Sequence, residues 1–304
     1  MDRRRFVLGV AGTGALAALA PLPFLGCGGT SSNRGGGGEW PDRPGPRVVV
    51  SFAPLYCFAA NVAGDDAVVK NVMTSRGPHD FDPTADDVRL VTKADLVLVV
   101  GLGLDEKKAR VMLDGSGNKS GRLVELGAKL AKKDLCEGTC NHADHGHGHD
   151  HDHKHDVDPH VWLSPAHAAM FTNFIADELK AADPAHAEGY EKRAAAYVAK
   201  LMALKEYGDK AFAGKTDKRL VTFHDSLAYF EQAFDLNVRG VLTKKPGQEP
   251  DAKEFKELIE ICKHPRQPVR VIATEPQYAG SPSGEALRKA LADAGVKDPV
   301  LVEF

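Results

Sequence analysis

LVLVV, residues 96–100, is an uninterrupted apolar run rich in valine. A half-exposed strand alternates polar and apolar residues, so a run without alternation predicts a strand covered on both faces of a parallel sheet. The neighbouring segments predict strands over 48–52, 68–73 and 122–126, and helices over 54–63, 84–93 and 164–182. This alternation predicts a doubly wound α/β lobe over residues 47–183.

A second lobe of the same kind is predicted for residues 214–304. Its strands are expected over 220–223, 238–242, 269–274 and 300–304, and its helices over 227–234, 251–262 and 283–294. The same rhythm of strands and helices indicates a second Rossmann-like α/β lobe.

One long helix is predicted to join the lobes over residues 184–213. Asp183 and Pro184 form a strong helix start, with Asp183 as the N-cap. A helix of this length spans roughly 43 Å and would connect two lobes rigidly. Gly208 is a possible weak point. The residues expected to face inward are Ala194, Tyr197, Leu201, Leu204, Ala211 and Phe212.

The first 46 residues carry export signals and a linker. RRRFV (3–7) resembles a twin-arginine export signal, and FLGC (24–27) resembles a bacterial lipoprotein cleavage box. We predict a signal peptide over 1–26, lipidation of Cys27, and a flexible tether over 27–46. The protein is then anchored to a membrane from outside, in the periplasm or at the cell surface. A plain secreted protein with an incidental Cys27 is the alternative.

The net charge bears on the class of partner, and the positions of the cysteines bear on their roles. Without residues 1–26 the chain has 36 basic and 41 acidic residues, a net charge of −5, so nucleic acid is not expected as a partner. Cys57 and Cys262 lie in apolar helical segments and are expected to be small buried residues. Cys136 and Cys140 either form a disulfide or join in metal capture as thiolates.

A histidine-rich tract, HADHGHGHDHDHKH, occupies residues 142–155. Imidazole is a ligand that suits zinc, copper and nickel, so the tract is predicted to capture transition-metal ions. A solvated low-complexity loop without a task is the alternative. The predicted capturing residues are His142, His145, His147, His149, His151, His153 and His155.

Three further histidines are placed to form a fixed site. His79 follows the second strand, His160 follows the tract, and His224 follows the strand at 220–223. Ligands of open α/β sheets bind beyond the carboxyl ends of the strands, so these residues are expected to meet in the cleft between the lobes. Three imidazoles leave one position of a zinc tetrahedron open. The aspartates expected to accept the second ring N–H, if they are not capping or turn residues, are Asp80, Asp158 and Asp225.

Several segments resemble the zinc-specific solute-binding proteins of bacterial ABC importers, the ZnuA-like group. The resemblance runs from about Val48 to Phe304 and rests on VVVSFAPLY (48–56), PHDFDPT (78–84), ADLVLVVGLG (94–103), the histidine-rich tract, DPHVWLSP (158–165), FHDSLAYF (223–230) and ATEPQ (273–277). It implies Zn²⁺ held between two lobes by His79, His160 and His224. It also implies delivery to a membrane permease driven by a cytoplasmic ATPase, without catalysis. We expect a monomer.

The fourth ligand and the choice of metal depend on two further positions, Glu275 and His224. Some family members carry an acidic ligand beyond the last strand, where this sequence ends at Phe304, so water is expected as the fourth ligand. Glu275 is a weaker candidate for a ligand or an orienting group, and a turn with Pro276 is its structural alternative. Manganese-type members tend to have a carboxylate where His224 stands, and an imidazole there favours zinc. A zinc hydrolase, or a surface zinc store or adhesin, would also use such histidines.

Overall fold

The computed structural model describes residues 40–73, 77–79, 81–138, 157–243, 250–275 and 282–303. The predicted signal peptide, Cys27, Asp80, Cys140 and the histidine-rich tract lie outside the described residues. No helix in the described ranges combines the length and the apolar character needed to cross a membrane.

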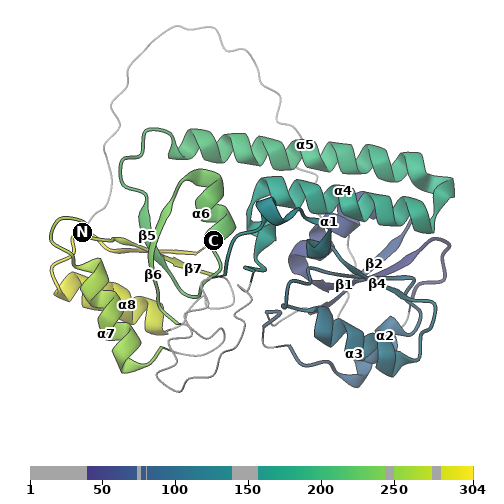
Figure 1. Ribbon diagram of the computed structural model, residues 1–304, viewed down its shortest axis with the longest axis horizontal. Coiled ribbons are helices and arrows are strands. Elements are labelled where there is room, and N and C mark those ends of the chain that lie inside the picture. The colour runs from purple at the N-terminus through teal and green to yellow at the C-terminus, as the bar shows by residue number, and fades with distance from the viewer. Residues whose placement is uncertain are drawn as a thin grey trace, which may run out of the picture. The chain divides into compact units, whose positions relative to one another are not determined.

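The first lobe is built on a parallel sheet of four strands in the order β2-β1-β3-β4. The strands are β1 (Arg47–Phe52), β2 (Val68–Met73), β3 (Leu96–Val99) and β4 (Arg122–Glu125). Helices α1 (Ala53–Ala63) and α4 (Pro165–Ala182) cover one face, and α2 (Ala85–Val91) and α3 (Glu106–Ser116) cover the other (Figure 1). No residue of β3 is more than 2% exposed, as the unbroken apolar run predicted.

Helix α3 has no counterpart among the elements predicted from the sequence. Only Ala109 and Met112 of this helix are buried, so its apolar pattern is too sparse to stand out. By contrast, α2 begins with the predicted capping box, in which the side chains of Thr84 and Asp87 bond to each other's backbone N–H.

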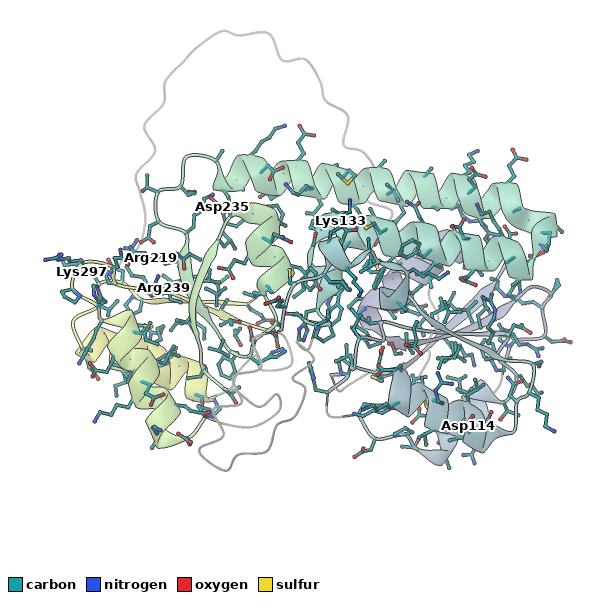
Figure 2. All side chains as sticks on the ribbon, viewed as in Figure 1. Asp114, Lys133, Arg219, Asp235, Arg239 and Lys297 are labelled. Atoms are coloured by element: carbon teal, nitrogen blue, oxygen red, sulfur yellow. The ribbon has the colours of Figure 1, made fainter. Side chains whose placement is uncertain are left out.

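The second lobe repeats the design, with the parallel strand order β6-β5-β7-β8. Its elements are β5 (Arg219–Thr222), β6 (Asn237–Val241), β7 (Val271–Thr274), β8 (Val300–Glu303), α6 (Ala228–Phe234), α7 (Ala252–Cys262) and α8 (Pro282–Asp293). A pocket of about 430 Å³ lies near the N-terminal ends of these strands. It is lined by Asp217, Arg270 and Lys297, of which Lys297 is labelled in Figure 2. His224 and Glu275 follow strands at the opposite edge.

The predicted connecting helix is α5 (Ala187–Phe212), preceded by the short 3-10 turn η4 (Pro184–His186). It packs along α4 and also contacts α1 and α6 (Figure 1). Asp183 is the N-cap residue of η4, as predicted, but its side chain makes no capping bond. Its carboxylate instead contacts His186 Nδ1 at 2.7 Å and accepts from Tyr190 Oη at 2.9 Å. This arrangement holds the start of α5 in place.

Arg193 fixes the first half of α5 to the first lobe. Its guanidinium donates to the carbonyl oxygens of Val62 (2.7 Å) and Ala63 (3.0 Å) and to Asp66 Oδ2 (2.7 Å). These carbonyls belong to the last turn of α1, where a helix has unpaired acceptors and a cation is favourable. One side chain therefore caps α1 and ties α5 to it.

The buried face of α5 departs from the predicted seam near its middle. Tyr190, Ala194 and Leu201 are buried, but Leu204 is 55% exposed and Ala211 is also exposed. At 3.6 residues per turn, the position that follows Leu201 on this face is 205 rather than 204. Lys205 occupies it, with Nζ 5.3 Å from the centre of the Phe234 ring.

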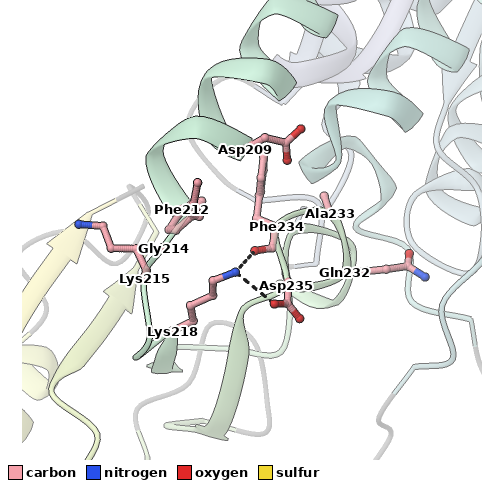
Figure 3. A pocket seen from close by; sticks show the side chains of 10 residues that line it. Asp209, Phe212, Gly214, Lys215, Lys218, Gln232, Ala233, Phe234 and Asp235 are labelled. Atoms are coloured by element: carbon pink, nitrogen blue, oxygen red, sulfur yellow. Dashed lines mark hydrogen bonds and ion pairs between the residues drawn. The ribbon is translucent and has the colours of Figure 1, made fainter.

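The end of α5 is fixed to the second lobe by close aromatic packing. Gly208 is buried, and a Cβ added there would lie 2.2 Å from Phe234 Cε1, so this glycine permits close contact and is not a weak point. The Phe212 ring packs against Phe230 and Phe234. Lys218 Nζ donates to the carbonyl oxygen of Phe234 at 3.4 Å beside a pocket of about 250 Å³ (Figure 3).

The cysteines differ in part from expectation. Cys262 is buried, and burial raises the pKa of its thiol to about 12. Cys57 is exposed, which contradicts the prediction, because the buried face of α1 is formed by its neighbours Leu55 and Phe58. Cys136 is half-buried, and its two proposed roles with Cys140, a disulfide or metal capture, stay predictions because Cys140 lies outside the described residues.

Replacing Gly208 by alanine should lower the free energy of unfolding by about 1–3 kcal/mol, because the new methyl group overpacks the buried Phe234 ring. Gly115→Ala in α3 is the matched control, since its Cβ would meet only Val88 Cγ1, at 3.8 Å. There the gain in helix propensity should raise stability by about 0.5–1 kcal/mol. Urea unfolding of both variants measures this, and equal stabilisation by both would contradict the packing argument.

Candidate metal centre

His79 lies in the turn after β2. It is held in place by α3, the helix that was not predicted from the sequence. Lys108 of α3 donates from Nζ to the carbonyl oxygens of His79 (2.9 Å) and Pro78 (3.3 Å). The backbone of the turn is thereby fixed, while the His79 side chain stays half-buried. Nothing in the local sequence marks Lys108 for this role, because the contact joins residues 29 positions apart.

His160 lies just before the turn η3 (Val161–Leu163) and is held by the aspartate two residues earlier. Asp158 Oδ1 accepts from the backbone N–H of His160 at 2.7 Å and lies 2.8 Å from His160 Nδ1. Both residues are buried. A carboxylate at Nδ1 favours the tautomer that carries its proton there, which leaves the lone pair of Nε2 available to a metal. Asp158 therefore has the orienting position predicted for it.

His224 lies two residues after the end of β5 and is 3% exposed. Its Nδ1 lies 2.7 Å from Glu275 Oε2, and Glu275 follows β7, the strand beside β5. Ser226 Oγ donates to the other carboxylate oxygen of Glu275. Glu275 thus orients His224 from behind, in the role that the sequence also suggested for Asp225.

Asp225 lies close enough to the site for its carboxyl group to respond to the histidines. Burial raises the pKa of Asp225, and the imidazoles of His160 and His224 act in the opposite direction. The third aspartate predicted to orient a ring, Asp80, is outside the described residues.

The three candidate ligands converge on one point. His160 Nε2 lies 3.0 Å from His79 Nε2 and 3.3 Å from His224 Nε2, and ligand atoms of all three residues lie within 4.8 Å of one another. Zinc–nitrogen bonds of about 2.0–2.1 Å in a tetrahedron place neighbouring nitrogens about 3.3 Å apart. The arrangement therefore fits one tetrahedral ion with a fourth position left over.

The electrostatic surroundings keep His79 in the form that binds metal. Burial, with contributions from His160, His224 and Lys108, lowers the pKa of His79 to about 3. A metal ligand must be an unprotonated imidazole, so His79 is ready to coordinate throughout the physiological pH range.

The histidine-rich segment leaves and rejoins the fold beside this site. Glu137 and Val157 form an antiparallel bridge, and the backbone N–H of Asp158 donates to the carbonyl oxygen of Cys136 at 3.1 Å. The two ends of the segment are therefore paired immediately before Asp158 and His160. The seven tract histidines themselves lie outside the described residues.

Comparison with known proteins identifies the family. Residues 48–302 match the model of the family described as zinc-uptake complex component A, periplasmic, and the chain belongs to this family. It is 31% identical over 256 residues to the zinc-binding lipoprotein AdcA of Streptococcus pneumoniae, a match that covers 84% of this chain and 49% of that protein. The chain thus spans about half the length of the curated relatives it matches first.

Solved structures share the fold. A Zn(II)-bound mutant variant of AdcAII from Streptococcus pneumoniae is 28% identical, with a TM-score of 0.68 and coverage of 86% of this chain and 88% of that one. FpvC from Pseudomonas aeruginosa in complex with Mn²⁺ gives the same identity, TM-score and coverages. The predicted fold of two α/β lobes and the predicted family resemblance are confirmed.

Metal-free protein should lose stability as the pH falls from about 6.5 toward 3. The unfolded chain protonates His79 near its ordinary pKa of 6.5, whereas the folded protein does so only near 3, so protons favour unfolding between these values. Urea unfolding in the presence of a chelator measures this, and His79→Asn should make the decline shallower. An equal decline in His79→Asn and in the exposed-site control His264→Asn would contradict the assignment.

Glu275→Gln should weaken zinc binding about 10- to 100-fold, the effect typical of removing a carboxylate that orients a metal-binding histidine. Because Glu275 lies behind His224 and not beside Nε2, the absorption spectrum of the Co²⁺-substituted protein should remain that of a tetrahedral ion. Competition titration and this spectrum provide the measurements, with exposed Glu257→Gln as control. A change in coordination number would make Glu275 a direct ligand instead.

Proposed function

We propose that this member of the zinc-uptake component family binds one Zn²⁺ between its lobes through His79, His160 and His224. It hands the ion to an ABC permease in the membrane, which a cytoplasmic ATPase drives. The observation that supports this is the meeting of three imidazoles from both lobes, in which His160 Nε2 lies 3.0 Å from His79 Nε2 and 3.3 Å from His224 Nε2. Two buried carboxylates contact the other side of His160 and His224.

The donor atoms favour zinc over manganese. Imidazole nitrogen suits zinc, copper and nickel, whereas manganese prefers oxygen ligands. FpvC, which has the same fold, is in complex with Mn²⁺, so the fold alone does not choose the metal. A manganese-type binding protein is the second candidate. Since the Glu275 carboxylate contacts His224 Nδ1 and Ser226, water is the proposed fourth ligand.

Capture and release, rather than catalysis, fit the site. A zinc hydrolase needs a general base next to the metal-bound water. The carboxylates of Asp158 and Glu275 face the Nδ1 atoms of His160 and His224, on the side of the rings away from Nε2. The pockets beside Asp235 and Lys297 are lined by none of the candidate ligands. The proposal is therefore a binding protein and not an enzyme.

The remaining sequence-based predictions complete the proposal. The tract histidines capture zinc weakly and raise its local concentration beside the fixed site, as multivalent binding allows. Signal cleavage and lipidation at Cys27 anchor a monomer outside the cytoplasm, in the periplasm or at the cell surface. A surface zinc store or adhesin would need only the tract.

Zinc titration with a competing chelator, combined with metal analysis, tests the function. The protein should hold one Zn²⁺ tightly, and His79→Ala, His160→Ala and His224→Ala should each abolish tight binding, because two imidazoles do not complete the site. His264→Ala, at an exposed position, is the control and should bind as the unaltered protein does.

Deletion of residues 142–155 separates the tract from the fixed site. The paired ends at Glu137 and Val157 allow a short turn to close the gap. The shortened protein should keep the single tight site and lose additional weak ones. Loss of tight binding on deletion would favour the zinc store, and tight binding of Mn²⁺ over Zn²⁺ would favour the manganese-type protein.

A further inference from the structure

Tyr229 belongs to the second lobe by sequence and to the first lobe by packing. It lies in α6, yet its side chain is fully buried within the hydrophobic core of the first lobe. The ring packs edge-on against His167 of α4, with ring centres 5.1 Å apart. A tyrosine in this position spans the boundary between the lobes next to the metal centre.

The Tyr229 hydroxyl group makes two hydrogen bonds to the first lobe. It donates to the backbone carbonyl oxygen of Asp158 at 2.8 Å and accepts from the backbone N–H of Cys136 at 3.1 Å. Burial raises the pKa of Tyr229 above its ordinary value, so the hydroxyl keeps the proton that it donates. These backbone groups lie at the base of the histidine-rich segment, where Cys136 and Asp158 also bond to each other.

The bond to Asp158 reaches a candidate ligand through one intermediate residue. The Asp158 carboxylate holds both the backbone N–H and Nδ1 of His160. Any shift of the Asp158 backbone therefore moves the ring whose Nε2 lies between the other two. His224, the ligand from the second lobe, precedes Tyr229 by five residues. The segment 224–229 thus carries the candidate ligand His224, and its Tyr229 also holds Asp158, which orients the candidate ligand His160.

We propose that Tyr229 is a positioning residue of the metal centre, which couples the placement of His224 in the second lobe to the orientation of His160 in the first. The inference rests on the proposed zinc-binding function. Without the hydroxyl group, the buried carbonyl of Asp158 loses its partner and the Asp158–His160 turn is free to rotate away from the other two rings. Preorganisation of this kind raises affinity by lowering the cost of ordering the ligands.

Tyr229→Phe and Tyr190→Phe form a matched pair for the test. Both tyrosines are fully buried, and the Tyr190 hydroxyl also has two partners, Asp66 O and Asp183 Oδ2, at the other end of the long helix. Each variant should unfold at a lower temperature. Only Tyr229→Phe should weaken zinc binding, by about 10-fold, with faster zinc release and an altered spectrum of the Co²⁺-substituted protein.

A double-mutant cycle with Asp158→Ala tests the route. If Tyr229 acts through Asp158, Tyr229→Phe should change zinc affinity much less in the Asp158→Ala background than in the unaltered protein. The proposal would be overturned if Tyr229→Phe lost as much stability as Tyr190→Phe but kept the zinc affinity and the Co²⁺ spectrum of the unaltered protein. Absence of tight zinc binding in the unaltered protein would instead overturn the proposed function.

Discussion

The contact between a buried carboxylate and the rear nitrogen of an imidazole is the interaction on which the site depends. Asp158 makes it with His160 and Glu275 makes it with His224. A neutral imidazole has two tautomers, and only one directs a lone pair from Nε2 toward the centre. The carboxylates select that tautomer, and their charge favours a cation where three ring nitrogens would otherwise only crowd one another.

This selection is useful only if the two lobes hold their histidines at a fixed separation. The long helix α5 supplies that constraint because each half is fixed to a different lobe. Arg193 caps the last turn of α1, and Gly208 and Phe212 pack closely against Phe234 of α6. We expect a helix fixed in this way to limit hinge motion, so that ordering of the site is confined to the turns that bear the candidate ligands.

Much of this organisation could be predicted from the sequence. The exceptions are features that depend on contacts between segments far apart in the chain. The strand over 68–73 and the Thr84 capping box depend on local patterns, so they were found. The exposure of Leu204 and Cys57 depends on which side of a helix meets its neighbour. The roles of Lys108 and Glu275 arise from contacts between distant segments. Residue type and spacing suggested the three histidines, Asp158 as an orienting residue and Glu275 as a weaker candidate, whereas no local pattern indicated Lys108.

The three histidines are unequally buried, so the site is more open to solvent on one side than on the other. His160 and His224 are 4% and 3% exposed, whereas His79 is half-buried. The Lys108 contacts fix the His79 backbone, so the His79 side chain can turn while the turn that carries it stays in place. An ion held here is shielded from solvent by the other two rings and their carboxylates. If the three histidines hold an ion as proposed, we expect it to exchange past His79, the least buried of the three.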